Sequence, residues 1–170
     1  MTYILETPRL ALREIVLGDL DFMAEMLGNP QVMEYWPKCY SRQESHQWLL
    51  KQQIRYRQDG YGYWLVLEKE KLQPVGQVGL MKMKIEEQEE IALGYIIHPQ
   101  FWKEGFAFEA SKACIDYAFS DLDAKRVIAL IRPENIPSQK VAEKLGMKHS
   151  GEVVYAGYRH LIFEIVKVKN

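Results

Sequence analysis

Residues 98–113 read HPQFWKEGFAFEASKA, and this stretch decides the fold. The β-branched residues at 91–97 predict a strand before it, whereas the alanine-rich residues after Gly105 have the spacing of a helix. The strand therefore passes into the helix through a single glycine. The first turn of a helix has about four amides without an intrahelical partner and a partial positive charge. Because Gly105 leaves the backbone accessible, we expect this turn to bind an anion.

Length and composition limit what this turn belongs to. The 170 residues, 48% of them hydrophobic, suit one domain over residues 1–170 with a sizeable core. A formal net charge of −1 with dispersed charges argues against a nucleic-acid partner. Cys39 and Cys114 lie far apart, so we expect neither a disulfide framework nor a cysteine metal site. No signal peptide or membrane-spanning run is evident, and we expect a cytoplasmic protein without a membrane partner.

The hydrophobic pattern predicts an α+β fold. Strands are expected at residues 9–15, 63–69, 75–85, 91–97, 125–131, 152–156 and 159–167. Helices are expected at 20–27 and at 106–122. Another should run from a capping box of Ser41 with Glu44 to Gly60, and a fourth from near Pro137 to Gly146. Residues 63–97 form an antiparallel meander, and the strand, helix and strand over 91–131 form one right-handed parallel crossover.

Several common site motifs are missing from the chain. WKEGFA lacks the further glycines of a dinucleotide fingerprint and the GK[ST] ending of a P-loop, and there is no HExxH or GxSxG. The four histidines are isolated, so we predict no metal site and no serine triad. Gly105 also admits a simpler interpretation as an ordinary turn glycine.

Two separate motifs resemble the GNAT superfamily of acyl-CoA-dependent N-acyltransferases, and more narrowly the branch that acetylates the N-termini of ribosomal proteins. The first is a Trp-x-x-Gly-x-Ala turn, which Trp102, Gly105, Ala107 and Glu109 match. The second is an Asn-x-x-Ser helix start running into Glu-Lys-Leu-Gly, matched by Asn135, Ser138 and residues 143–146. The opening ETPRLALRE is also typical of this branch, so the resemblance covers essentially the full chain.

The resemblance implies the GNAT fold, a mixed and mostly antiparallel central sheet with about four helices. Its central parallel strands, residues 91–97 and 125–131, would splay apart and admit acetyl-CoA. The pantetheine arm would pair with one of them, and the diphosphate would lie on the amides of residues 103–107. The coenzyme-binding residues expected from the resemblance are Ile96, Ile97, His98, Trp102, Lys103, Glu104, Gly105, Phe106, Ala107, Asn135 and Ser138.

Two positions depart from the pattern of this branch. Glu104 stands where a lysine is frequent, and Phe108 stands where a threonine is frequent. A carboxylate facing a diphosphate is unfavourable by about 1 kcal/mol or more. We therefore expect the Glu104 side chain to point outward and Lys103 to supply the local positive charge.

The catalytic residues are less clearly marked than the coenzyme turn. Ser138 is the candidate that protonates the departing thiolate, although Ser138 and Asn135 also suit a helix cap. Glu90 is the candidate general base, unless it belongs to a solvated acidic turn with its neighbours. Tyr158 and His160 near the last hairpin are further candidates.

The function expected from the resemblance is transfer of an acetyl group from acetyl-CoA to a primary amine, by direct attack in a ternary complex. The acceptor is a protein N-terminus or a small molecule, and the enzyme is a monomer or a homodimer. A non-catalytic acyl-CoA-binding sensor and an acyl-CoA hydrolase are the alternatives. The aromatic residues at 35–37 and 61–64 either line the acceptor site or pack in the core.

Overall fold

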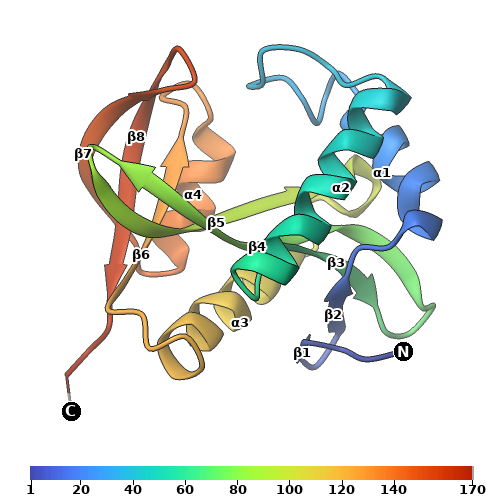
Figure 1. Ribbon diagram of the computed structural model, residues 1–170, viewed down its shortest axis with the longest axis horizontal. Helices are drawn as coiled ribbons and strands as arrows, with labels where there is room; N and C mark the ends of the chain where they lie inside the picture. The colour runs from blue at the N-terminus through green and yellow to red at the C-terminus, as the bar shows by residue number, and fades with distance from the viewer. Residues whose placement is uncertain (170) are drawn as a thin grey trace.

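The computed structural model describes residues 1–169, in which four α-helices surround one eight-stranded sheet (Figure 1). Across the sheet the strands are β1 (Leu5–Glu6), β2 (Leu10–Glu14), β3 (Tyr63–Glu68), β4 (Gln73–Ile85), β5 (Gln88–Ile97), β6 (Arg126–Ile131), β8 (Tyr158–Val166) and β7 (Lys148–Tyr155). Only β5 and β6 are parallel, and every other neighbouring pair is antiparallel. The predicted α+β fold with its mixed, mostly antiparallel sheet is confirmed.

The sheet parts between its two parallel strands. β4 and β5 stay in register over ten pairs, and β6 and β8 over six, but β5 and β6 share only the pair Ala92 and Ile128. Beyond Ala92 the edge of β5 that faces β6 has no strand partner. The predicted splay of the two parallel strands is therefore present.

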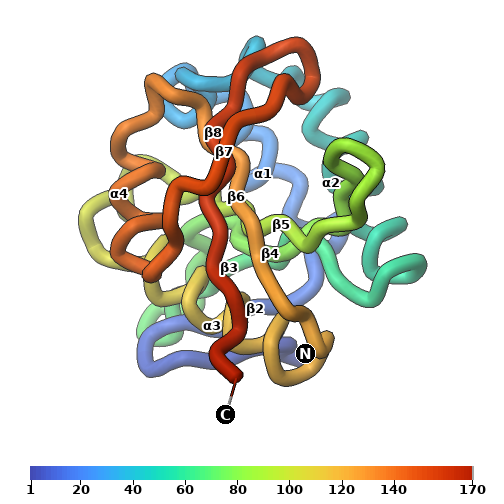
Figure 2. Tube along the Cα trace, turned by 90° about the vertical axis from the view of Figure 1, so that its left-hand side faces the viewer, coloured from blue at the N-terminus to red at the C-terminus, as the bar shows by residue number. Residues whose placement is uncertain are grey.

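The helices are α1 (Leu20–Leu27), α2 (Arg42–Gln58), α3 (Phe106–Ser120) and α4 (Ile136–Lys144). Helices α1 and α2 cover one face of the sheet, whereas α3 and α4 cover the other, as the edge-on view in Figure 2 shows. Strand β3 illustrates the two faces, because Trp64 and Val66 enter the core under α3 while Leu65 and Leu67 enter the core under α1. No helix within residues 1–169 combines the length and apolarity that crossing a membrane requires.

Local signals set the ends of several elements as the sequence predicts. Ser41 accepts a hydrogen bond from the amide of Glu44, whose side chain accepts from the Ser41 amide, so the capping box at the start of α2 is confirmed. Helix α1 occupies the predicted residues 20–27.

The acidic hairpin differs from the prediction. Its turn consists of Glu86 and Glu87 alone, both with positive φ, which is the conformation of a tight two-residue hairpin turn. Strand β5 therefore begins at Gln88, three residues earlier than expected, and Glu90 lies inside the sheet and is buried. The interpretation of Glu90 as part of a solvated turn is wrong for this reason.

Candidate active site

A cleft of about 580 Å³ lies where the two parallel strands part. Its lining comes from the segment between α1 and α2, from helix α2, from strands β3, β4, β5 and β6, from the start of α4, and from the hairpin of β7 and β8. Five of the sequence-predicted candidates contribute to its lining, namely Ile96, Asn135, Ser138, Tyr158 and His160. The splay of the sheet thus brings together residues that are far apart in the chain.

The free edge of β5 offers main-chain groups to this gap. The amide of His98 donates to the carbonyl of Val75 at 2.9 Å, so His98 and, by alternation, Ile96 direct their main-chain groups toward β4. Tyr95 and Ile97 direct theirs toward the gap. Of the three residues expected to pair with a ligand, only Ile97 therefore presents its main chain there, because alternate residues of an antiparallel strand face opposite edges.

Trp102 fixes one end of this edge. Its indole nitrogen donates to the carbonyl of Ile97 at 2.7 Å. The Ile97 carbonyl is therefore already bonded within the protein, while the Ile97 amide remains directed into the gap. Trp102 acts on the site through this bond, which joins the end of β5 to the loop before α3.

The loop before α3 leaves the start of the helix open. Lys103 and Gly105 both have positive φ, 65° and 81°, so the backbone turns sharply at two positions. Gly105 is the N-cap and provides no side-chain hydrogen bond, so the first-turn amides lack both intrahelical and capping partners. The Phe106 side chain is buried and anchors the helix start, whereas Ala107 keeps the next position small.

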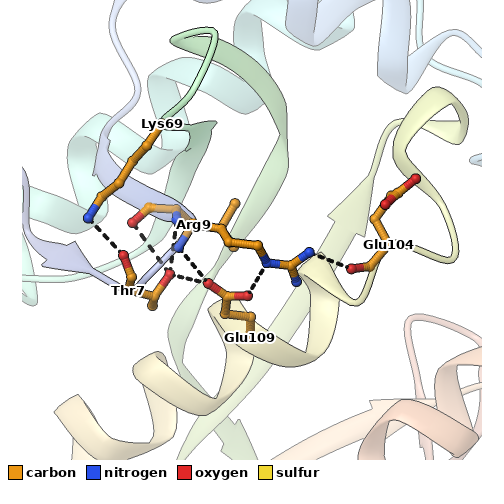
Figure 3. Close-up of polar contacts among 6 residues, drawn as sticks. Thr7, Arg9, Lys69, Glu104 and Glu109 are labelled. Atoms are coloured by element: carbon orange, nitrogen blue, oxygen red, sulfur yellow. Dashed lines mark hydrogen bonds and ion pairs between the residues drawn. The ribbon is translucent and has the colours of Figure 1, made fainter.

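Arg9, directly before β2, holds this loop from its outer side (Figure 3). Its Nη1 donates to the carbonyl of Glu104 at 2.9 Å, and its Nε donates to Glu109 Oε2 at 2.7 Å. The guanidinium also lies over the Phe106 ring, 4.6 Å from its centroid. The Glu104 side chain is exposed, and Figure 3 shows its carboxylate turned away from Arg9. The outward direction expected for Glu104 is therefore present.

Glu109 is held charged in the first turn of α3. Its Oε1 accepts from the Thr7 hydroxyl at 2.6 Å and from the Arg9 amide at 3.0 Å. Burial on its own would raise the pKa of Glu109, but these hydrogen bonds and the Arg9 charge hold that pKa below its ordinary value. Because Arg9 neutralises this carboxylate, Glu109 does not repel an anion at the helix start.

The sequence did not predict the contact between Arg9 and Glu109, although both residues lie in motifs that it marks. Arg9 lies in the opening ETPRL, and Glu109 lies in the glycine turn. The motif match included Glu109 without a role, and it gave none to Arg9. A single sequence carries no signal that joins two positions one hundred residues apart.

Ser138 and Tyr95 form a hydroxyl pair at the start of α4. Ser138 Oγ donates to the Tyr95 hydroxyl at 3.0 Å, and that hydroxyl donates to the Ser138 carbonyl at 2.6 Å. Burial raises the pKa of Tyr95 to about 12, so the phenol keeps its proton near neutral pH. Asn135 caps α4 by accepting from the Ser138 amide at 3.2 Å. Sequence reasoning missed Tyr95, whose only signal was an aromatic residue in the strand before the turn.

Glu90 lies apart from the cleft. Its carboxylate accepts two hydrogen bonds from Arg126, which also donates to Glu164 at 2.7 Å. Glu90 is buried and contributes to a separate hollow beside Arg126, not to the lining of the cleft. Glu90 is therefore not proposed as the general base, since its carboxylate forms an ion pair with Arg126 away from the cleft.

Aromatic side chains gather on the α2 side of the cleft. Trp36, Tyr40, Trp48 and Tyr63 pack on one another with ring centroids between 5.3 and 6.2 Å apart, and all four line the cleft. The predicted stretch 35–37 lines it fully. Of the stretch 61–64 only Tyr63 does, because Trp64 points to the opposite face of β3 and packs under α3.

Comparisons with known proteins agree with this geometry. A family model described as an acetyltransferase (GNAT) domain matches residues 9–148. The uncharacterised protein YkkB of Bacillus subtilis (strain 168) is 33% identical over 147 residues, which cover 86% of each chain.

Two solved structures have the same fold. A putative ribosomal-protein-serine acetyltransferase from Vibrio cholerae is 24% identical, with a TM-score of 0.80 over 98% of this chain and 100% of that one. Spermidine N-acetyltransferase from Vibrio cholerae, in complex with CoA and spermine, is 22% identical, with a TM-score of 0.75 over 94% and 96% of the two chains.

Proposed function

The chain belongs to the acetyltransferase (GNAT) domain family, and we propose that it moves the acetyl group of acetyl-CoA directly to a primary amine bound in the same complex. The observation that carries the proposal is the gap between β5 and β6. Strand β5 runs from this gap into the open start of α3, and the cleft lies over the same strands. One route therefore joins an anion-binding helix start to a cleft large enough for an acceptor.

The residues around the gap suit the coenzyme. The carbonyl of Tyr95 and the amide of Ile97 would hold the pantetheine arm in the manner of an added strand. The amides of residues 103–107 would hold the diphosphate, with Gly105 allowing close approach and Lys103 adding a positive charge. The bound coenzyme supplies an activated acetyl thioester.

The protein's own groups account for the remaining requirements of the reaction. The Tyr95 amide, two residues before Ile97 on the same free edge and in the lining of the cleft, would donate to the thioester oxygen and stabilise the negative charge that develops there. The Tyr95 and Ser138 hydroxyls would return a proton to the departing thiolate, since Tyr95 keeps its proton near neutral pH. An imidazole is a common general base near neutral pH, and His160 is the imidazole in the cleft. We therefore assign removal of the amine proton to His160.

The acceptor class is supported by two kinds of relative. The name of one structural neighbour specifies a ribosomal-protein serine, and the other was solved with CoA and spermine. The first name refers to a protein and the second structure holds a polyamine; a protein offers a primary amine at its N-terminus, and spermine carries primary amines at its ends. The acceptor we propose is accordingly a primary amine of either kind.

A thiol-release assay tests the proposal. The protein is mixed with acetyl-CoA and panels of amines and N-terminal peptides, and free thiol and acetylated product are measured together. We expect thiol and product in equal amounts, and only when an acceptor is present. Thiol release without acceptor would identify a hydrolase, whereas coenzyme binding without turnover of any amine would identify a sensor module.

A further inference from the structure

The charges that line the cleft have one sign. Five basic side chains contribute to its lining, and they are Lys51, Arg55, Lys82, Lys84 and Arg132. No aspartate or glutamate is among its lining residues. The chain as a whole carries a formal net charge of −1, so this concentration of positive charge is local to the cleft.

Three of these five basic residues already have acidic partners outside the cleft. The pairs are Lys82 with Glu89 at 3.6 Å, Lys84 with Glu87 at 3.1 Å, and Arg132 with Glu134 at 3.4 Å. Their charges are therefore largely balanced within the protein.

Lys51 and Arg55 have no acidic partner within residues 1–169. They stand four residues apart on α2, a spacing at which like charges face each other and repel. Among these described residues, the one side-chain hydrogen bond of Arg55 runs to the neutral amide oxygen of Gln52, at 3.2 Å. Lys51 keeps access to solvent, but partial burial and then the Arg55 charge lower its pKa. This pair is an unbalanced positive centre on the wall of the cleft.

The wall beside this centre is aromatic. Trp36, Tyr40, Trp48 and Tyr63 cover it with apolar ring surface, and Trp48 lies on the same helix as Lys51. Ring surface favours a ligand with an apolar body, and the two cations favour an anionic group on that ligand.

From these observations, and resting on the acetyl transfer proposed above, we propose that the acceptor is a primary amine that carries a carboxylate, which Lys51 and Arg55 bind while its apolar part packs on the aromatic wall. A polyamine such as spermine would instead bring further positive charge to a positive wall. Two kinds of molecule have these groups. One is a peptide whose second residue is acidic, close to the N-terminal amine, and the other is a free amino acid.

The positive wall also helps the reaction itself. The attacking amine must lose its proton, and nearby positive charge lowers the pKa of an ammonium group. A carboxylate on the acceptor anchors the substrate, while Lys51 and Arg55 disfavour the charged form of its amine. Binding and deprotonation are therefore served by the same pair.

Matched acceptors test the proposal. Three-residue peptides with an amidated C-terminus and Asp or Asn at the second position compare charge at equal size. Tyrosine and tyrosinamide do so for the small-molecule source, and spermine represents a polycation. We expect kcat/KM to be about tenfold higher for the acidic member of at least one pair, and that preference to weaken as salt screens the charges. The pair that shows the preference identifies the source.

Variants show which residues cause the preference for acidic acceptors. Changing Lys51→Gln and Arg55→Gln together should reduce the ratio between acidic and neutral acceptors below about threefold. Arg57→Gln is the matched control, since Arg57 is an exposed cation of the same helix that does not line the cleft, and it should keep the ratio.

If neither pair shows a preference for its acidic member, or if the wild-type enzyme uses spermine as well as it uses the acidic acceptors, the proposal is overturned while acetyl transfer stays intact. If no acceptor is turned over, the acetyl transfer itself fails, and calorimetric binding of the Asp and Asn peptides still tests the anionic preference. Equal binding of the two peptides would then overturn it.

Discussion

Helices α3 and α4 both begin beside the parted strands, but their first turns are completed in different ways. The start of α4 is closed by its own chain, because Asn135 accepts from the Ser138 amide. The start of α3 has Gly105 as its N-cap, which has no side chain to offer, so its amides stay available. At a capped start a first-turn amide gains its hydrogen-bond partner when the protein folds, whereas at an open start the amides can bond a ligand.

The difference extends to what holds each turn in place. The open start of α3 is kept in position by groups that do not block it: the Arg9 clamp on its outer side and the buried Phe106 beneath it. Lys103 adopts a left-handed conformation there, which costs on the order of 1 kcal/mol and is maintained before any ligand arrives. The loop thus keeps its open shape without a ligand, as the proposed diphosphate site requires, while the cap of α4 uses the Ser138 amide and leaves its hydroxyl to donate to Tyr95.

The largest expected effect comes from closing the open start. Gly105→Asp would place a carboxylate among the free amides, and we expect acetyl-CoA affinity to fall roughly a hundredfold through repulsion of the diphosphate. Calorimetric titration with coenzyme A measures this loss. Gly105→Asn is the control, because Asn has the same shape and tolerates positive φ without the charge. An equal loss for both variants would mean that backbone strain, not charge, is responsible.

The next effect concerns chemistry at the closed start. Tyr95→Phe removes the phenol proton beside Ser138, and we expect kcat to fall on the order of tenfold to a hundredfold with little change in the KM for acetyl-CoA. Because the pKa of Tyr95 is raised to about 12, the phenol stays protonated and the wild-type rate should show no ionisation from it below about pH 11. Steady-state kinetics across pH checks both statements. A rise in KM with unchanged kcat would assign Tyr95 to binding instead.

Releasing the clamp should weaken the open start without closing it. Arg9→Ala removes the hydrogen bonds to the Glu104 carbonyl and to Glu109, and it leaves the Glu109 carboxylate uncompensated near the helix start. We expect coenzyme affinity to fall about tenfold. Arg9→Lys keeps the charge but lacks the guanidinium that reaches both acceptors. Its coenzyme affinity should lie between those of the wild type and of Arg9→Ala. Unchanged affinity in Arg9→Ala would limit the clamp to stability.

Removing the cap of α4 tests the other side of the comparison. Asn135→Ala should lower the free energy of unfolding by about 1 kcal/mol, since the Ser138 amide loses its partner. Urea denaturation measures this change. Coenzyme affinity should stay within about twofold, and Asn135→Asp, which can still accept from the Ser138 amide, should recover most of the stability. A loss of affinity that exceeds the loss of stability would give Asn135 a direct contact with the coenzyme.

The smallest effect is expected from the exposed charges of the open loop. Lys103→Ala should weaken coenzyme binding about twofold to threefold, because an exposed charge near an anion contributes little in water. Glu104→Ala should change it less, since the Glu104 carboxylate points outward and its carbonyl, which Arg9 binds, is kept. Affinities in the reverse order would contradict the assignment of this loop to the diphosphate.

Local residue chemistry let the sequence alone determine several of the elements and some of their ends. The Ser41 and Glu44 capping box, the glycine before α3 and the meander over residues 63–97 act within a few residues of chain, so their outcome follows from backbone preferences and hydrophobic period. The parallel crossover also follows, because a strand, a helix and a strand in succession pack in one handed arrangement.

Only the tertiary structure decided which distant residues meet. Arg9 bonds Glu109, Arg126 bonds Glu90, and β8 lies between β6 and β7. All three arrangements join segments far apart in the chain. The same holds for the cleft, which Lys51 and Arg55 line together with residues from other elements. Such pairings depend on how whole layers pack, and no local preference encodes which charge will find a partner within the protein.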